Sequence, residues 1–265
     1  MAAGAAATTI STCPSSSGKT RRTRAGTVIE IALGSGRAIW TDRHGGVSQP
    51  PYDTANLSSR GGDRPEAVRQ NRGRLADSIG VEAPDTWWWL RQVHGPATVV
   101  AAGPAGGEAP IADAAVTTQP GVPLVVLTAD CAPIALATDD AVAAVHAGWT
   151  GLLAGVIAEA VAALRAVGHG DVRAVLGPCI HPAQYEFGRT DLDRLIAAFG
   201  PGVESRTADG QPAFDLPAGV RRALDAAGVH DFEDVGICTA ASRDHFSHRR
   251  DGETGRQALV VLRDP

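Results

Sequence analysis

Hydrophobic positions along the chain follow two periods. Short apolar or alternating runs bounded by Gly, Pro or Asp are typical of strands. The first two such runs, 27–33 and 37–43, flank Gly34 and Gly36 and predict a β-hairpin. The same criterion predicts strands over 87–95, 97–103, 113–119, 123–131, 132–140, 141–149, 172–180, 235–240 and 258–264.

Other segments have the helical period. Apolar residues within 151–168 recur at spacings of three and four, which predicts one amphipathic helix over that range. A further helix is predicted over 64–80, with Asp63 as its N-cap, Pro65 in its first turn and Gly80 at its end. Helices are also predicted over 191–200 and 216–228. Strands interleaved with helices, without an internal linker, predict one α/β domain of mixed sheets covered by helices, spanning 27–265.

Composition and charge limit which classes of partner and which compartment are expected for the protein. The net charge is −5 and the basic residues are dispersed among acidic ones, which argues against nucleic acid as a ligand. No apolar run approaches the roughly 18 residues that span a bilayer, and no secretory signal precedes the domain, so we expect no membrane association. The segment 1–26 is rich in Ala, Ser, Thr and Arg and contains no acid, which predicts a disordered tail. The cysteines Cys13, Cys131, Cys179 and Cys238 are too scattered for a disulfide framework, which favours the cytoplasm.

Three potential metal ligands stand at the ends of apolar runs: His94, Cys131 and His146. Their separations, 37 and 15 residues, differ from the two-to-five-residue clips of structural zinc fingers. If they converge, two imidazoles and one thiolate give the three protein ligands typical of catalytic zinc, with a fourth position open. The alternative is a hydrogen-bonded strand-end His and a buried Cys. Gly95 and Gly148 follow the two histidines and leave backbone room for a ligand.

Several segments carry a resemblance to a known family. They are TDRHGGVSQPPYDTANLS, LRQVHG, ADAAVTTQPGVPLVVLTADCAPIALA, AAVHAGW, LGPCIHPAQYEFG and HFSHRRDGETGRQA. In this order they resemble the motifs of the laccase-domain family, also called polyphenol oxidase or YfiH-type proteins, over about residues 27 to 263. The resemblance implies a monomeric α/β/β/α fold with zinc held by His94, Cys131 and His146. It also implies a purine nucleoside phosphorylase acting on adenosine, inosine, guanosine or methylthioadenosine with phosphate, together with adenosine deamination.

Other residues in the matching motifs suit such substrates. Arg43, Arg249 and Arg250 suit bidentate phosphate contact, although at least one of the three is expected to be a solvated surface group. Asn56 either binds ribose or base or stabilises its own loop. Asp130, beside Cys131, is either a proton shuttle for deamination or a group that orients a ligand or turn.

The sequence departs from the family at two positions and from other zinc enzymes in its motifs. Thr150 follows HAGW, where the family usually has Arg or Lys, and this removes a cation close to His146. His181 stands where the family often has Gly. The H-x-E and P-C-x-x-C signature of zinc deaminases is absent. Cys179 has no evident base beside it, which argues against a catalytic thiol there.

Three other functions are alternatives, and the sequence argues against the first of them. A multicopper phenol oxidase needs about eight His, usually in H-x-H pairs, whereas this chain has 8 His in total, no such pair, and Met only at position 1. Adventitious copper at the three-ligand site would still support weak oxidation. A hydrolase that edits cell-wall precursors would use Cys131 as nucleophile and a His as base. The third alternative is a binding protein without catalysis.

Overall fold

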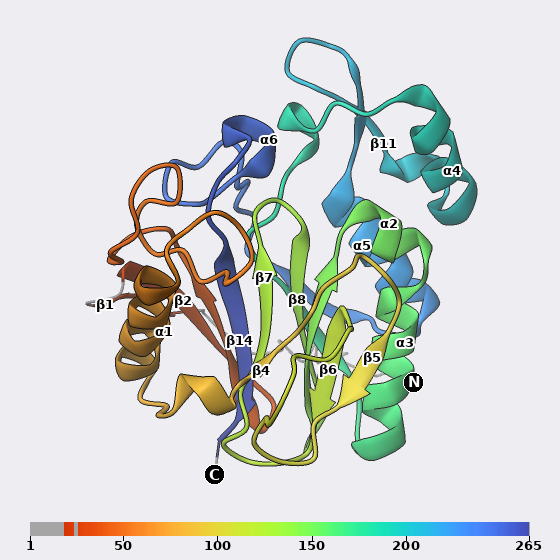
Figure 1. Cartoon of the computed structure of the whole chain (residues 1–265). Coiled ribbons are helices and arrows are strands. Elements are labelled where there is room, and N and C mark those ends of the chain that lie inside the picture. The colour runs from red at the N-terminus through yellow and green to blue at the C-terminus, as the bar shows by residue number, and fades with distance from the viewer. Residues whose placement is uncertain (1–18, 24–25, 265) are drawn as a thin grey trace, which may run out of the picture.

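Two mixed sheets form the centre of the protein. The computed structural model describes residues 19–23 and 26–264 (Figure 1). Each large sheet has six strands, and a separate hairpin forms a third, two-stranded sheet. Most segments with a two-residue period form the predicted strands, because one or both of their faces are buried.

The first sheet has the strand order β1-β2-β3-β14-β7-β4. Its members are β1 (Lys19–Thr23), β2 (Gly26–Leu33), β3 (Gly36–Thr41), β14 (Gln257–Arg263), β7 (Leu124–Thr128) and β4 (Trp88–Trp89). The predicted hairpin is confirmed as β2 and β3, with Gly34 at a φ of +59° in its turn. The structure differs from the predicted disordered tail at β1, which pairs antiparallel with β2. Residues 1–18 and 24–25 of that tail lie outside the described residues.

The second sheet has the order β13-β10-β8-β9-β6-β5. Its members are β13 (Asp231–Asp234), β10 (Arg173–Leu176), β8 (Ala132–Ala137), β9 (Val142–Ala147), β6 (Ala114–Thr117) and β5 (Thr98–Val100). The three central antiparallel neighbours β8, β9 and β6 are entirely buried. They are therefore rigid supports for whatever follows their ends.

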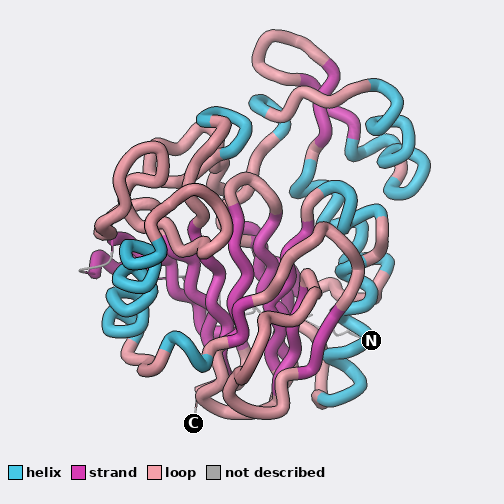
Figure 2. Tube along the Cα trace, viewed as in Figure 1, coloured by secondary structure: helices cyan, strands magenta, loops and turns pink. Residues whose placement is uncertain are grey.

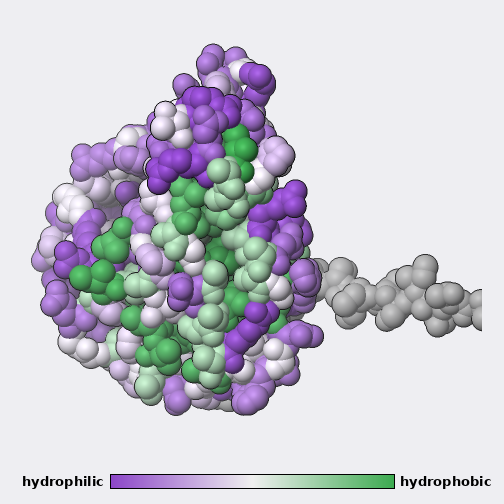
Figure 3. Space-filling view, turned by 90° about the vertical axis from the view of Figure 1, so that its right-hand side faces the viewer, coloured by the Kyte–Doolittle hydropathy of each residue, from purple (hydrophilic) through white to green (hydrophobic). Residues whose placement is uncertain are grey.

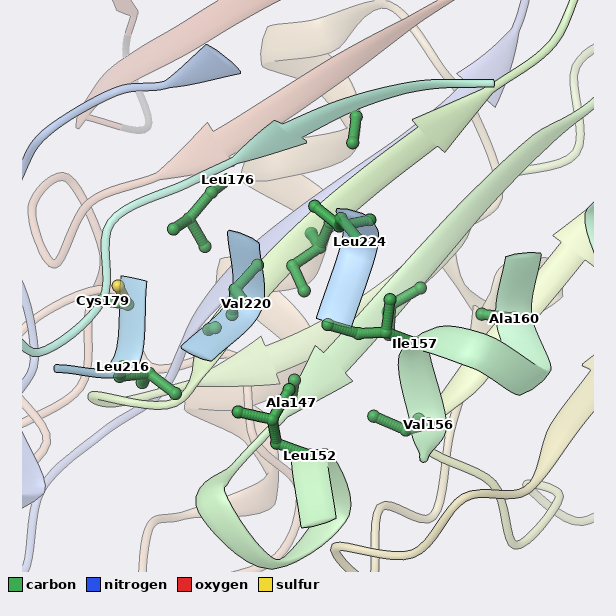
Figure 4. Packing of buried hydrophobic residues seen from close by; sticks show 14 of the residues in the cluster. Ala147, Leu152, Val156, Ile157, Ala160, Leu176, Cys179, Leu216, Val220 and Leu224 are labelled. Carbon is green, nitrogen blue, oxygen red and sulfur yellow. The ribbon is translucent and has the colours of Figure 1, made fainter. Parts of the chain in front are cut away.

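The sheets stack face to face, and helices cover both outer faces (Figure 2). Alternate residues of both sheets form one core between them, such as Trp40, Leu259 and Val142. The opposite face of the first sheet packs on α1 (Pro65–Ile79). The opposite face of the second sheet packs on α2 (Trp149–Leu153), α3 (Val156–Val167) and α5 (Leu216–Ala226), through Leu152, Ile157, Val220 and their neighbours (Figure 4). The predicted α/β/β/α layering is confirmed.

Shorter elements complete the fold. The helix α4 (Arg189–Phe199) and the hairpin β11 (Glu204–Arg206) and β12 (Pro212–Phe214) form the upper right of Figure 1. The helix α6 (His248–Asp251) lies beside the loops that follow β3. The 3-10 turns are η1 (Pro84–Thr86), η2 (Pro182–Gln184) and η3 (Pro201–Val203).

Three local predictions are wrong. The helix expected over 151–168 is two helices, because Gly155 adopts a left-handed φ of +88° between α2 and α3. Residues 235–240 were expected as a strand, but β13 precedes them and pairs with β10, and they form only an isolated bridge between Cys238 and Cys179. Asp63 does not cap α1; its carboxylate accepts hydrogen bonds from Ser48 Oγ and Asn56 Nδ2 instead.

The surface has hydrophobic groups between hydrophilic regions on the side that carries α3 and β5 (Figure 3). Among the described residues, the large hydrophobic side chains that are exposed are Val93, Val100 and Ile111. In the same part of the chain, no helix has the length and apolar character needed to cross a bilayer.

Candidate metal centre

The three predicted ligands meet in the structure. One donor atom from each of His94, Cys131 and His146 lies within 4.8 Å of the others. The imidazole rings of His94 and His146 lie edge to face, with their centroids 4.8 Å apart. Among the described residues this is the one group of three or more His, Cys, Asp or Glu side chains placed to hold a metal ion.

Strand ends position two of these side chains. His146 belongs to β9, and Cys131 directly precedes β8. The two strands are antiparallel with Ala132 opposite Ala147 and Pro133 opposite His146, so Cys131 lies beside Gly148. His146 is buried, whereas Cys131 is partly exposed and His94 is exposed. The centre is therefore anchored on one side and open on the other, as a catalytic metal site requires.

Asp113 organises the other side of the centre, and sequence reasoning missed it. Its fully buried Oδ1 lies 2.8 Å from His146 Nδ1, and its carboxylate also accepts hydrogen bonds from the backbone N–H groups of Val93, His94 and Gly95. An ionised carboxylate only accepts, so Nδ1 of His146 carries the proton and Nε2 is left for a metal. Burial disfavours the charge of Asp113, but the hydrogen bonds from His146 and the amides hold the pKa of this carboxyl below its usual value.

The loop that carries His94 is also tied to the first sheet. The side-chain amide of Gln92 donates to the carbonyl of Leu127 and accepts from its N–H, both at 2.8 Å, and so continues the pairing beyond β7. His94 itself has a φ of +58°, a left-handed conformation that a non-glycine residue adopts only when its surroundings hold it there. Gln92 and Asp113 together supply that constraint.

Gly148 leaves the space that the side chains of His94 and Cys131 occupy. A Cβ atom at this position would lie 2.5 Å from His94 Nδ1 and 3.2 Å from Cys131 Sγ. The predicted need for glycine after His146 is thus explained by contact with the other two ligands. Gly95 is different, because a Cβ there would meet Val93 and Asp113 only at 3.6 and 3.9 Å, which is ordinary contact.

The thiol and the buried imidazole polarise each other. Burial opposes charge on both groups, but the His146 and His94 rings lower the pKa of Cys131 to about 6. Burial again acts against it, but the Cys131 thiolate and the Asp113 carboxylate raise the pKa of His146 to about 9. Both shifts favour the ionised pair of thiolate and imidazolium, and the thiolate is the form of cysteine that binds metals.

The three predicted phosphate-binding arginines are not equivalent. Arg43 and Arg250 line one cleft of about 530 Å³, where both reach the carboxylate of Asp251. Arg250 donates through Nε and NH2 to Asp251, and through NH1 and NH2 to four backbone carbonyls, so its guanidinium is saturated. Its hydrogen bonds with Asp251 raise its pKa. Arg250 therefore holds the loop 239–251 together, and its predicted contact with phosphate stays a prediction.

Arg43 and Arg249 retain some freedom. Arg43 contacts Asp53 at 3.4 Å and Asp251 at 3.5 Å, and its guanidinium lies over the ring of Phe246. Arg249 is exposed, donates to the Glu186 carbonyl and lies over Tyr185, without a carboxylate partner within 4.0 Å among the described residues. Of the predicted arginines, Arg249 is the most available to an anion, and Arg43 is less available.

Asn56 and Asp130 make hydrogen bonds within the protein that fit the structural roles predicted as alternatives for them. Asn56 is buried and commits both ends of its amide, donating to Asp63 and Ser58 and accepting from the N–H groups of Ser58 and Arg256. The carboxylate of Asp130 accepts from Thr239 Oγ1 and from the N–H of Arg249, both at 2.6 Å. Asp130 thus orients the turn before Cys131 and fastens α6 to it.

The structure also shows the surroundings of Thr150 and Cys179. Thr150 Oγ1 lies 3.4 Å from the His94 carbonyl, so the residue that departs from the family pattern is next to the centre. Cys179 is fully buried, and burial raises its pKa well above the usual value, which agrees with a thiol that has no catalytic part.

A family model described as multi-copper polyphenol oxidoreductase laccase matches residues 37–264. The chain belongs to this laccase-domain family. A relative in Streptomyces coelicolor, named purine nucleoside phosphorylase, is 43% identical over 85% of this chain and 94% of its own length.

Solved structures of similar proteins have the laccase-domain fold as well. A protein from Neisseria meningitidis is 36% identical with a TM-score of 0.79, covering 88% of this chain and 96% of its own. YlmD from Geobacillus stearothermophilus is 29% identical with a TM-score of 0.82, covering 89% and 96%. The laccase-domain chain described here gathers one group of three ligands within its described residues, whereas a multicopper oxidase needs about eight His for its trinuclear centre alone.

Proposed function

We propose that the protein is a zinc-dependent purine nucleoside phosphorylase that cleaves adenosine, inosine, guanosine or methylthioadenosine with phosphate, and that it also deaminates adenosine. The observation that carries this proposal is the group of His94, Cys131 and His146. The group is open on the His94 side, and Gly148 leaves space for the side chains of His94 and Cys131. The name of the Streptomyces coelicolor relative supports the phosphorylase reaction.

The donor set favours zinc. Two imidazoles and a thiolate suit a borderline metal that accepts tetrahedral coordination. When bound, zinc would supply a Lewis acid and lower the pKa of a water molecule. Copper at the same residues is then an adventitious substitute. His94, Cys131 and His146 would hold the ion, Asp113 would orient His146 and the His94 loop, and Asp130 would orient the turn before Cys131.

The phosphorolysis balances without a further reagent. A phosphate oxygen forms a bond to C1′ of the ribose, the bond from C1′ to N9 of the purine breaks, and the base leaves with a proton. The products are the free purine and ribose 1-phosphate. Such a reaction needs cations around an anionic nucleophile. Arg249 and, less freely, Arg43 are the predicted arginines that remain for this role.

The proposal extends to the compartment, the oligomeric state and the partners of the enzyme. We propose a cytoplasmic monomer with no nucleic acid or membrane partner. Cys131, Cys179 and Cys238 are free thiols, and thiols persist in reducing compartments.

The decisive experiment measures zinc content and nucleoside turnover together for the wild type, His94→Ala and Cys131→Ala. Adenosine and phosphate should give adenine, ribose 1-phosphate and inosine in the wild type, and both variants should lose zinc and turnover in parallel. Turnover that survives the loss of zinc would contradict the proposal.

One alternative has an observation in its favour. The donor atoms of Cys131 and His146 lie within 4.8 Å of each other, which is also the arrangement of a thiol hydrolase, in which Cys131 would attack an amide of a cell-wall precursor. Chelation separates the two functions. A thiol hydrolase keeps its activity after the metal has been removed, whereas the proposed phosphorylase loses it.

A further inference from the structure

Arg256 lies beside the turn that carries Cys131. It is not one of the three arginines predicted from the sequence to contact phosphate. The antiparallel register of β14 and β7 pairs Gln257 with Thr128. One step further along both chains, Arg256 is opposite Ala129, immediately before Asp130 and Cys131. Arg256 is therefore brought to the candidate centre by sheet pairing and not by a mobile loop.

The backbone of Arg256 is fixed on the side away from β7. Its N–H donates to Asn56 Oδ1 at 2.9 Å, and its carbonyl accepts from the N–H of Leu57 at 3.1 Å. Asn56 is in turn held by Asp63 and by Asn71. The buried side-chain amide of Asn56 thus holds the backbone of Arg256 in place. Asn56 therefore has no free donor or acceptor for a substrate.

The guanidinium of Arg256 has no counter-ion in the described part of the chain. Its NH1 donates to the carbonyls of Thr254 and Gly255 at 2.8 and 2.9 Å, and no carboxylate described there lies within 4.0 Å. Asp130 does not serve, because Thr239 and Arg249 occupy its oxygens. The Nε and NH2 groups form the edge that binds oxyanions in a bidentate manner, and they are left for another partner.

The electrostatic surroundings of this cation point in the same direction. Burial lowers the pKa of Arg256, and the opposing influences come from Cys131, Asp130 and Tyr52. A partly desolvated cation without a counter-ion is unfavourable until an anion arrives. Arg43 and Arg250 differ, because Asp53 and Asp251 already neutralise them.

We propose that Arg256 binds the phosphate nucleophile beside the metal centre. The proposal rests on the phosphorylase function proposed above and adds a residue and a position to it.

The experiment compares the zinc-loaded wild type with Arg256→Gln and Arg256→Lys. Inorganic phosphate is titrated calorimetrically in the absence of nucleoside, and phosphorolysis is measured as a function of phosphate concentration. We expect Arg256→Gln to weaken phosphate binding and raise KM for phosphate by about 10- to 100-fold. KM for the nucleoside and the zinc content should stay near the wild-type values. Arg256→Lys keeps the charge without the bidentate edge, so it should give a smaller loss.

Arg69→Gln is the matched control, because Arg69 is an exposed arginine on α1 paired with Glu66. It should leave phosphate binding unchanged. Unaltered phosphate affinity in Arg256→Gln overturns the proposal, and so does an equal loss in the control. If Arg256→Gln does not fold, Arg256→Lys decides, since unaltered affinity in that variant overturns the proposal too.

The two proposals can fail separately. A wild type that binds phosphate through Arg256 but cleaves no purine nucleoside contradicts the phosphorylase function and leaves the anion site standing. A wild type that carries out phosphorolysis with no effect of Arg256→Gln does the reverse.

Discussion

A single carboxylate links two of the candidate ligands. Asp113 contacts the ring of His146 and the backbone amides around His94, so it sets the imidazole tautomer and the loop conformation together. The signal in the sequence was a lone acid directly before the buried strand β6. Such an acid is usually a turn residue, and nothing in its spacing reveals that two distant histidines converge on it.

Asp113→Asn should lower zinc affinity by about 10- to 100-fold, because an outer partner of a metal-ligating His has an effect of that size. Competition with a chelating dye measures it. Asp140→Asn is the matched control: Asp140 Oδ2 lies 2.8 Å from Nδ1 of exposed His169, outside the centre. Equal zinc affinity in Asp113→Asn and the wild type would contradict the role given to Asp113.

At the scale of elements, the interruption between α2 and α3 leaves α2 as a short separate helix beside the candidate metal centre. The short helix α2 begins directly after Gly148, and its Leu152 enters the core while Thr150 stays beside His94. A continuous helix over 151–168 has the same apolar stripe, so the hydrophobic period alone predicts no interruption. The left-handed Gly155 reorients the chain so that α3 lies along the second sheet.

Gly155→Ala should reduce the free energy of unfolding by about 1 to 2 kcal/mol, because its φ of +88° is strained for any residue with a Cβ and no atom lies within 4 Å to add a clash. Gly73→Ala, within α1 and equally free of neighbours, should increase it by about 0.5 to 1 kcal/mol. Urea unfolding of both variants tests this pair. Stabilisation by Gly155→Ala would mean that α2 and α3 can join.

The whole molecule brings the centre together at one end of the two sheets. The turn with Cys131 is where the chain crosses from β7 of the first sheet to β8 of the second. His146 comes from the second sheet, and the His94 loop is tied to the first sheet through Gln92. Because both sheets share one core, displacement of either sheet would separate the ligands.

A buried histidine should make the stability of the molecule depend on pH. Burial lowers the pKa of His245 to about 4, and its Nδ1 lies 3.0 Å from Ser242 Oγ. The unfolded chain binds this proton near pH 6.5 and the folded protein does not, so stability is complete above pH 6.5 and falls as the pH drops toward 4. Between pH 7.5 and pH 5 we expect a contribution of about 2 kcal/mol, measured as the difference in pH dependence between wild type and His245→Gln in urea unfolding. His230→Gln, at an exposed position, should retain the wild-type dependence.

The sequence by itself determined the class of fold. Hydrophobic periods of two and of about 3.6 residues show which face of a strand or helix is buried, whatever element packs against that face. Most strands and the helices α1, α4 and α5 could therefore be predicted. The ligand residues could be proposed because strand ends and residue chemistry are visible in one dimension. That they bind zinc remains a prediction.

Only the tertiary structure decided which polar side chains are free and which are committed. Asn56 and Arg250 matched motifs but donate their N–H groups to backbone and carboxylate oxygens, whereas Arg256 and Asp113 gained their places through strand register and long-range hydrogen bonds. Hydrogen bonds are directional and join residues far apart in the chain, so they leave no period in the sequence. The site was therefore visible as a set of candidates, and three-dimensional pairing separated those that can act from those that hold the fold.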